Sequence, residues 1–93
     1  MSQEEVRAGR ILEIFGNYSV IQVPGRNHPA VAIQGDSLKI LQETVRELSD
    51  CLAVENLQEA RFPLQEIIDT LAEMISVYES AARRSGFDLP YHP

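Results

Sequence analysis

The hydrophobic positions follow two different patterns along the chain. In its first third, short runs of β-branched and aromatic residues at 10–15 and 18–23 flank the pair Gly16-Asn17, which predicts a tight hairpin turn between two antiparallel strands. The alternating run "AVAIQ" predicts a third short strand, so the whole meander covers about 9–34. A three-stranded antiparallel meander of this composition leaves one apolar face that needs a cover.

After residue 35 the apolar residues recur at spacings of three and four, which is the period of an amphipathic helix. The pattern predicts a first helix over 36–53 and a second over 57–85. The apolar stripe of the first helix consists of Leu38, Leu41, Val45, Leu48 and Leu52. The stripe of the second is wider and consists of Leu64, Ile67, Ile68, Leu71, Met74, Ile75, Tyr78, Ala81 and Ala82. Its width predicts two neighbours, such as the first helix and another subunit.

The second helix has two candidate starting points. Asn56 can cap a helix that begins at 57 and kinks at Pro63, or the helix starts at 63 with the proline in its first turn. Gly86 predicts a left-handed C-cap at the other end. The tail at 86–93 carries aromatic and aliphatic residues, so we expect it to fold back. The predicted fold is therefore α+β: a three-stranded antiparallel β-meander followed by two antiparallel α-helices packed on one face (βββαα).

Length and charge narrow the function. The 93 residues are enough for a single domain, 1–93. The net charge is −6 with its acidic excess after residue 35, and such a surface repels phosphate backbones, so nucleic-acid binding is not expected. No apolar run approaches the ~20 residues that span a bilayer, and the polar N-terminus is no signal peptide, so we expect a cytoplasmic protein that does not bind membranes. The acidic surface is either simply solvated or a docking surface for a basic protein partner.

The motif Gly35-Asp36-Ser37-Leu38 resembles the nucleophile block of the GDSL esterases and lipases, which would make Ser37 catalytic. The rest of that pattern is missing. The chain has no strand–helix alternation to build a parallel sheet, and its C-terminus lacks the Asp-x-x-His arrangement of the other triad members. We therefore expect no enzymatic activity and a structural motif, in which Gly35 ends the strand while Asp36 and Ser37 cap the first helix.

The loop "PGRNHP" presents Arg26, Asn27 and His28 between two prolines. Pro24-Gly25 predicts a type II turn. The loop is either a turn that the topology requires or a preorganised contact loop for a partner or ligand. In the second case Arg26 would pair with a carboxylate or phosphate, and His28 would titrate near neutral pH. The two histidines and the single cysteine have no metal-ligand spacing, so neither a metal nor another cofactor is expected.

The segment 18–48 resembles HicB-type antitoxin domains, which share the order of strand, Pro-Gly turn, strand, Gly-Asp-Ser/Thr and amphipathic helix. The whole chain is still more similar to a family of short uncharacterised bacterial proteins. That family carries a "PGR-x-x-P … QGDSL" core, here within 24–38, and a C-terminal "LPY", here at 89–91. The second resemblance implies a fold but no activity.

Together these observations predict a small, non-enzymatic bacterial protein that binds another protein, as an antitoxin or immunity factor, and that self-associates as a homodimer through its helices. The alternative is a homo-oligomeric domain for assembly or for binding a small ligand.

Overall fold

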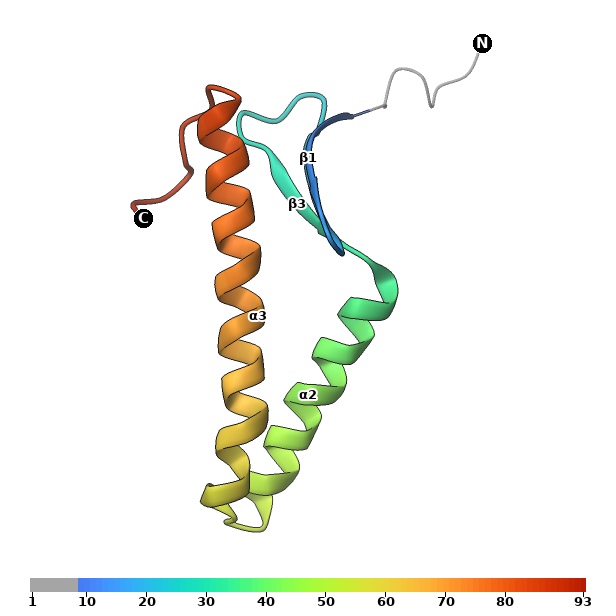
Figure 1. The fold of residues 1–93 in the computed structure, drawn as a ribbon, viewed down its shortest axis with the longest axis vertical. Coiled ribbons are helices and arrows are strands. Elements are labelled where there is room, and N and C mark those ends of the chain that lie inside the picture. The colour runs from blue at the N-terminus through green and yellow to red at the C-terminus, as the bar shows by residue number, and fades with distance from the viewer. Residues whose placement is uncertain (1–8) are drawn as a thin grey trace. The chain divides into compact units, whose positions relative to one another are not determined.

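The computed structural model describes residues 9–93, and the polar stretch 1–8 lies outside the described residues. Three strands precede two helices: β1 (Arg10–Phe15), β2 (Tyr18–Gln22), β3 (Ala30–Ile33), α2 (Gly35–Ala53) and α3 (Leu57–Arg84) (Figure 1). The predicted α+β fold with the order βββαα is confirmed. The described residues form two compact units, a sheet unit made of 9–33 with Met74–Pro93 and a hairpin unit, Gln34–Glu73.

The sheet is an antiparallel meander with the strand order β1-β2-β3. Phe15 pairs with Tyr18 beside the hairpin turn, and Val20 pairs with Val31 across β2 and β3. A β-bulge between Ile11 and Glu13 interrupts the register of the edge strand β1. Bulges of this kind twist an edge strand and hinder its pairing with other chains.

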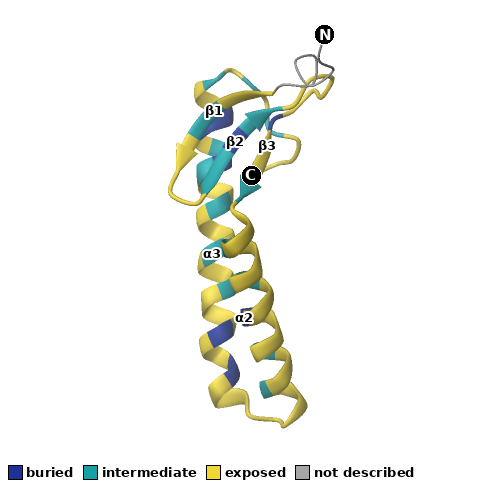
Figure 2. Ribbon diagram, turned by 90° about the vertical axis from the view of Figure 1, so that its right-hand side faces the viewer, coloured by how far each residue is buried: buried dark blue, intermediate teal, exposed yellow. Residues whose placement is uncertain are grey.

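The core of the sheet unit lies between the meander and the C-terminal part of α3. Val20 is completely buried against Tyr78 and Ala81, and Leu12 and Leu89 pack around them. Figure 2 shows these buried positions on β2 and the upper part of α3. Alanine on the helix lets the helix approach the sheet closely, and Leu89 brings the tail back onto the core as expected. The apolar cover that the meander requires is thus supplied by α3.

The start of α2 differs from the sequence prediction. Its N-cap is Gln34, whose carbonyl accepts the Leu38 N–H at 2.9 Å, and no side chain caps the helix. Gly35, Asp36 and Ser37 are not caps but the first helical turn, because the chain becomes helical directly after the extended Gln34. Asp36 Oδ1 accepts the Ser37 N–H at 2.8 Å, so this carboxylate satisfies a free amide from within the helix. An added Cβ at Gly35 would meet no atom within 4 Å, so this position does not require glycine.

The first of the two starting points for α3 is the one that the structure shows. Asn56 Oδ1 accepts the N–H of Glu59 at 3.2 Å, which is the geometry of an N-cap side chain. The helix begins at Leu57, and Pro63 lies inside it. Glu59 also supplies the acidic first turn that the helix dipole favours.

Both helices end in the same backbone motif. The amide three residues past the last helical residue donates to a carbonyl five residues earlier, at 2.8 Å after α2 and 2.9 Å after α3, as in a Schellman motif. The left-handed residue after α3 is Gly86, with φ 80°, as predicted. After α2 this position holds Glu55, with φ 57°. A residue with a Cβ is disfavoured there, so the turn of the hairpin unit contains a strained residue.

Candidate functional site

The PGRNHP loop, residues 24–29, starts with the predicted type II turn. Gly25 has φ 80°, and the Arg26 N–H donates to the Val23 carbonyl at 3.2 Å. The side chain of Gln22 at the end of β2 donates from Nε2 to the Arg26 carbonyl at 2.7 Å. A side chain of β2 therefore holds the backbone of the loop at Arg26.

The far end of the same loop is bound to α3 and to the C-terminal tail. The buried Tyr78 hydroxyl donates to the carbonyl of Pro29 at 2.9 Å. Nδ1 of His28 lies 3.0 Å from the Asp88 carbonyl, the distance of a hydrogen bond from the Nδ1–H tautomer. His28 thus joins the loop to the tail rather than standing free, a role that a lone histidine in a loop gives no sequence signal for.

Arg26 and Asn27 are the two predicted contact residues that the fold does not use. Both are exposed, and neither side chain forms a hydrogen bond to another described residue. The loop is therefore structural at its ends and open to a contact in its middle. Gly35, Asp36 and Ser37, by contrast, lie in the hairpin unit and have local roles in its first helical turn.

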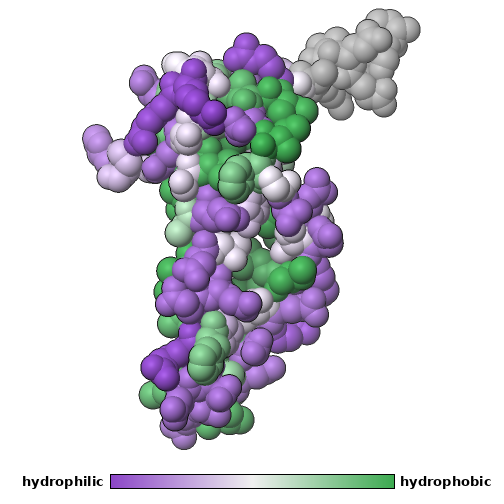
Figure 3. Space-filling view, in the orientation of Figure 1, coloured by the Kyte–Doolittle hydropathy of each residue, from purple (hydrophilic) through white to green (hydrophobic). Residues whose placement is uncertain are grey.

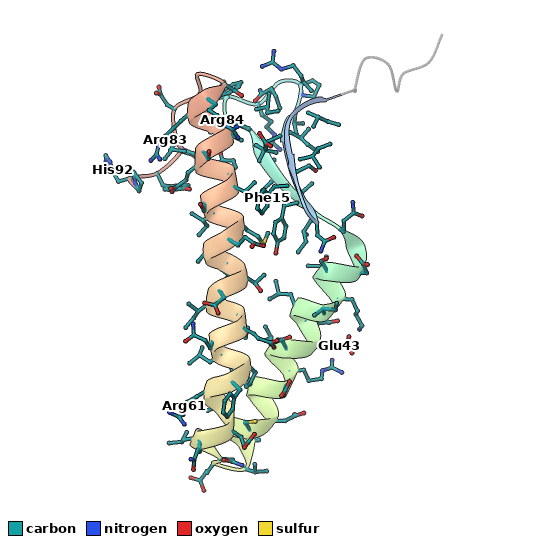
Figure 4. All side chains as sticks on the ribbon, in the orientation of Figure 1. Phe15, Glu43, Arg61, Arg83, Arg84 and His92 are labelled. Carbon is teal, nitrogen blue, oxygen red and sulfur yellow. The ribbon has the colours of Figure 1, made fainter. Side chains whose placement is uncertain are left out.

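The end of α3 is held to the sheet and the tail by two further side-chain contacts. Arg84 forms an ion pair with Glu13 of β1 at 2.6 Å, and Figure 4 shows Arg84 at the end of α3 beside the sheet. The Tyr91 hydroxyl donates to Glu79 Oε2 at 2.9 Å. Burial raises the pKa of Tyr78. The pKa of Tyr91 is raised by desolvation and by the hydrogen bond to, and negative charge of, Glu79.

The hairpin unit has a less complete interior. Its buried residues are the small Thr44 on α2 and Ala60 and Pro63 on α3. Thr44 directs its hydroxyl to the Ile40 carbonyl at 2.9 Å, so it satisfies its polar group within its own helix. Only a narrow seam between the two helices is therefore covered.

On the side of the pair that follows this seam by one residue, apolar side chains that are 43–68% exposed recur on both helices, with the charged Arg61 among them. The apolar residues are Leu38, Val45 and Leu52 on α2, and Leu57, Leu64, Ile68 and Leu71 on α3. In two antiparallel helices, residues that follow the seam by one position turn toward the same side of the pair. The hairpin unit therefore has one apolar face, made of these seven residues.

The positions before the seam form the opposite face, and that face is acidic. Its carboxylates are Glu43, Glu47 and Asp50 on α2, and Glu59, Glu66, Asp69 and Glu73 on α3. Figure 3 views the hairpin from this side, and most of the surface there is hydrophilic. Two large apolar side chains stand among the acids, since Phe62 and Ile40 are each 63% exposed.

Sequence reasoning found the apolar stripes but not the two faces. The width of the second stripe indicated a second neighbour for α3. The side of the hairpin on which the uncovered apolar residues lie depends, however, on which residues form the seam. The predicted stripes joined half-buried seam residues, such as Leu41, Leu48 and Ile67, to their exposed apolar neighbours, and the fully buried Thr44, Ala60 and Pro63 carry no strong hydrophobic signal. Their burial shows that Leu38 and Val45 lie beside the seam instead of in it.

No group of three or more His, Cys, Asp or Glu residues among residues 9–93 is arranged to hold a metal ion. No helix described in the structure is long and apolar enough to cross a membrane.

Comparison with known proteins places the chain in one family. No curated protein and no solved structure matches it. The sequence does match the model of a family of unknown function (DUF6959) over residues 1–91, which is nearly its whole length. The chain therefore belongs to the DUF6959 family, whose function is unknown.

Proposed function

We propose that this protein is a non-enzymatic protein-binding protein that assembles with further copies of itself through the apolar face of its hairpin unit. The observation that supports the proposal is the row of seven half-exposed aliphatic side chains on one side of α2 and α3. Contiguous apolar patches of this kind on soluble domains mark interaction surfaces. Helical hairpins with such faces pack in pairs as four-helix bundles.

A second copy would bring an equal apolar face to the contact, and the energy gained is of the same size as the cost of association. Burying an aliphatic side chain completely contributes about 1.5–3 kcal/mol, so covering one that is half exposed contributes about 1 kcal/mol. Seven such residues on each of two copies contribute on the order of 10 kcal/mol. Association costs about 4–15 kcal/mol in lost motional freedom. In a symmetric contact each apolar residue of the face is buried in both copies, so its contribution is made twice. An unrelated polar partner would not add a second apolar face.

Sedimentation equilibrium of the full chain over a range of concentrations tests this proposal. The natural protein is expected to form a discrete oligomer, and Ile68→Glu is expected to weaken it by at least ~30-fold, as for a central interface residue. Phe62→Glu is the matched control, since it also removes an exposed apolar side chain from α3 but on the acidic face. A monomeric natural protein, or equal effects of the two substitutions, would contradict the proposal.

A second candidate function is binding of a basic protein on the acidic face, as an antitoxin or immunity factor. Exposed Phe62 and Ile40 among the carboxylates favour it, because apolar anchors inside a charged surface are typical of protein interfaces. The resemblance of 18–48 to HicB-type antitoxins and the net charge of −6 agree with a basic partner.

Calorimetric titration with the basic protein encoded by a neighbouring gene tests this second function. The affinity should fall as salt rises, and Phe62→Ala should lower it at least ~10-fold. Ile68→Ala on the other face is the control and should leave it unchanged. Absence of binding at low salt would exclude this partner, and binding insensitive to Phe62→Ala would exclude this face.

A further inference from the structure

The apolar positions of α3 have a symmetric spacing. Leu64, Ile68, Leu71 and Ile75 are about half exposed, and they follow one another at intervals of four, three and four. All four belong to one uninterrupted helix. Reversing the direction of the helix gives the same intervals, so an antiparallel second α3 would set Leu64 against Ile75 and Ile68 against Leu71. The centre of this symmetry lies between residues 69 and 70.

The charges beside the apolar positions favour the same antiparallel direction. Arg61 and Glu79 are eighteen residues apart, about five helical turns, so they lie on the same side of α3, next to the apolar positions. Figure 4 shows Arg61 on the outer side of the helix. In the antiparallel arrangement Arg61 of one copy meets Glu79 of the other, and this occurs twice. A parallel arrangement would instead set Arg61 against Arg61.

We infer that two copies of this chain pair with α3 antiparallel to α3, about a two-fold axis at the level of residues 69 and 70, with Arg61 of each copy paired to Glu79 of the other. This inference rests on the proposed function, because it specifies the register in which the α3 part of the apolar face, together with Ile75 further along the same helix, meets a second copy.

Disulfide cross-linking in a Cys51→Ser background measures the register. A mixture of the Leu64→Cys and Ile75→Cys proteins is expected to cross-link, because the antiparallel register brings these positions together. Leu64→Cys alone is expected not to cross-link, since its two copies would be eleven residues apart along the helix, about 16 Å. A parallel pairing would reverse both results and overturn the inference.

Charge exchange tests the direction independently. Arg61→Glu and Glu79→Arg are each expected to raise the dimer Kd about 5-fold or more, and the double variant to restore it to within about 2-fold. Tyr91→Phe is the control, because it removes the hydrogen bond to Glu79 within one copy and leaves the carboxylate in place. A double variant as weak as the sum of the two single ones would overturn the inference.

The two levels of the proposal fail in different ways. If the natural protein sediments as a monomer, both the assembly and its register are wrong. If it forms a dimer that Ile68→Glu dissociates but Leu64→Cys alone cross-links, the assembly holds and only the antiparallel register is wrong.

Discussion

The two units of this small protein are held together by different kinds of contact. In the sheet unit, side-chain bonds join residues far apart in sequence: Arg84 to Glu13, Tyr78 to Pro29 and His28 to Asp88. In the hairpin unit, the side-chain bonds join residues no more than four positions apart, such as Gln65 to Asp69 and Lys39 to Gln42.

Burial follows the same division. The sheet unit buries Val20 and Tyr78 between three strands and a helix. The hairpin unit fully buries only small side chains, and leucines such as Leu38, Leu52 and Leu71 stay about half exposed. The apolar core of the sheet unit is therefore covered by residues of the same chain. The hairpin unit is held by local hydrogen bonds, and its apolar face stays exposed. This open face is the observation on which the proposed association rests.

The largest expected effect is a difference in unfolding free energy between the same substitution in the two units. Val20→Ala removes a completely buried side chain from the sheet core and should lower the free energy of unfolding by about 2–3 kcal/mol. Val45→Ala removes the same atoms from a side chain of the hairpin unit that is 47% exposed, and should cost less than about 1 kcal/mol in the dissociated protein. Urea unfolding at low protein concentration measures both. Equal losses would show that the open face of the hairpin is covered within a single copy.

Removal of one oxygen atom measures how much a long-range hydrogen bond contributes to the stability of the sheet unit. Tyr78→Phe leaves the buried Pro29 carbonyl without its donor and should cost about 1–2 kcal/mol. It should also change the response to alkali. Burial raises the folded-state pKa of Tyr78 above its ordinary value near 10, so the folded state binds this proton more tightly than the unfolded state does.

The stability linked to this proton is therefore complete below pH 10 and is lost as the pH rises through the folded-state pKa. Thermal unfolding between pH 8 and pH 11 should show a steeper decline for the natural protein than for Tyr78→Phe. Parallel declines would mean that Tyr78 does not report the closure of the sheet unit.

The elements themselves were predictable from the sequence because each has a strong local signal. The Gly16-Asn17 turn, the alternating strands, the Pro24-Gly25 turn and the Gly86 cap all depend on residues within a few positions of one another. The predicted type II turn and left-handed cap are both present. Local chemistry of this kind can be read without knowing the tertiary fold.

The sequence predictions that failed concern residues whose role depends on a partner distant in sequence or on a competing backbone conformation. His28 looked free because its acceptor lies sixty residues away, on the tail. Asp36 and Ser37 looked like caps because their side chains suit one, but the helix starts a residue earlier, at Gly35. The two faces of the hairpin depend on the seam, whose fully buried residues are small and give no strong hydrophobic signal. Arg26 and Asn27 keep the role of contact candidates that their position predicted.

The matched ends of the two helices provide a smaller test of the comparison. Glu55→Gly should raise the free energy of unfolding by about 0.5–1 kcal/mol, because glycine removes the Cβ penalty of a left-handed residue. Gly86→Ala should lower it by about 1 kcal/mol or more for the same reason. If removing a Cβ at residue 55 stabilises the protein and adding one at residue 86 destabilises it, the turn of the hairpin unit is strained and that of the sheet unit is relaxed. A destabilising Glu55→Gly would show that the carboxylate makes a contact that outweighs its strained backbone.

The smallest expected effects concern the first turn of α2, where the two units adjoin in sequence. Asp36→Ala should cost about 0.5–1 kcal/mol, because the carboxylate accepts the Ser37 N–H and lies at the positive end of the helix dipole. Ser37→Ala should change stability by less than about 0.3 kcal/mol, since alanine has the higher helix propensity and no cap is lost. Asp36→Asn keeps an oxygen acceptor and removes the charge, so its cost should shrink as salt screens the dipole. Thermal unfolding in low and high salt compares the three. If Ser37→Ala cost as much as Asp36→Ala, the serine would be the cap that its sequence suggested, and α2 would begin after it.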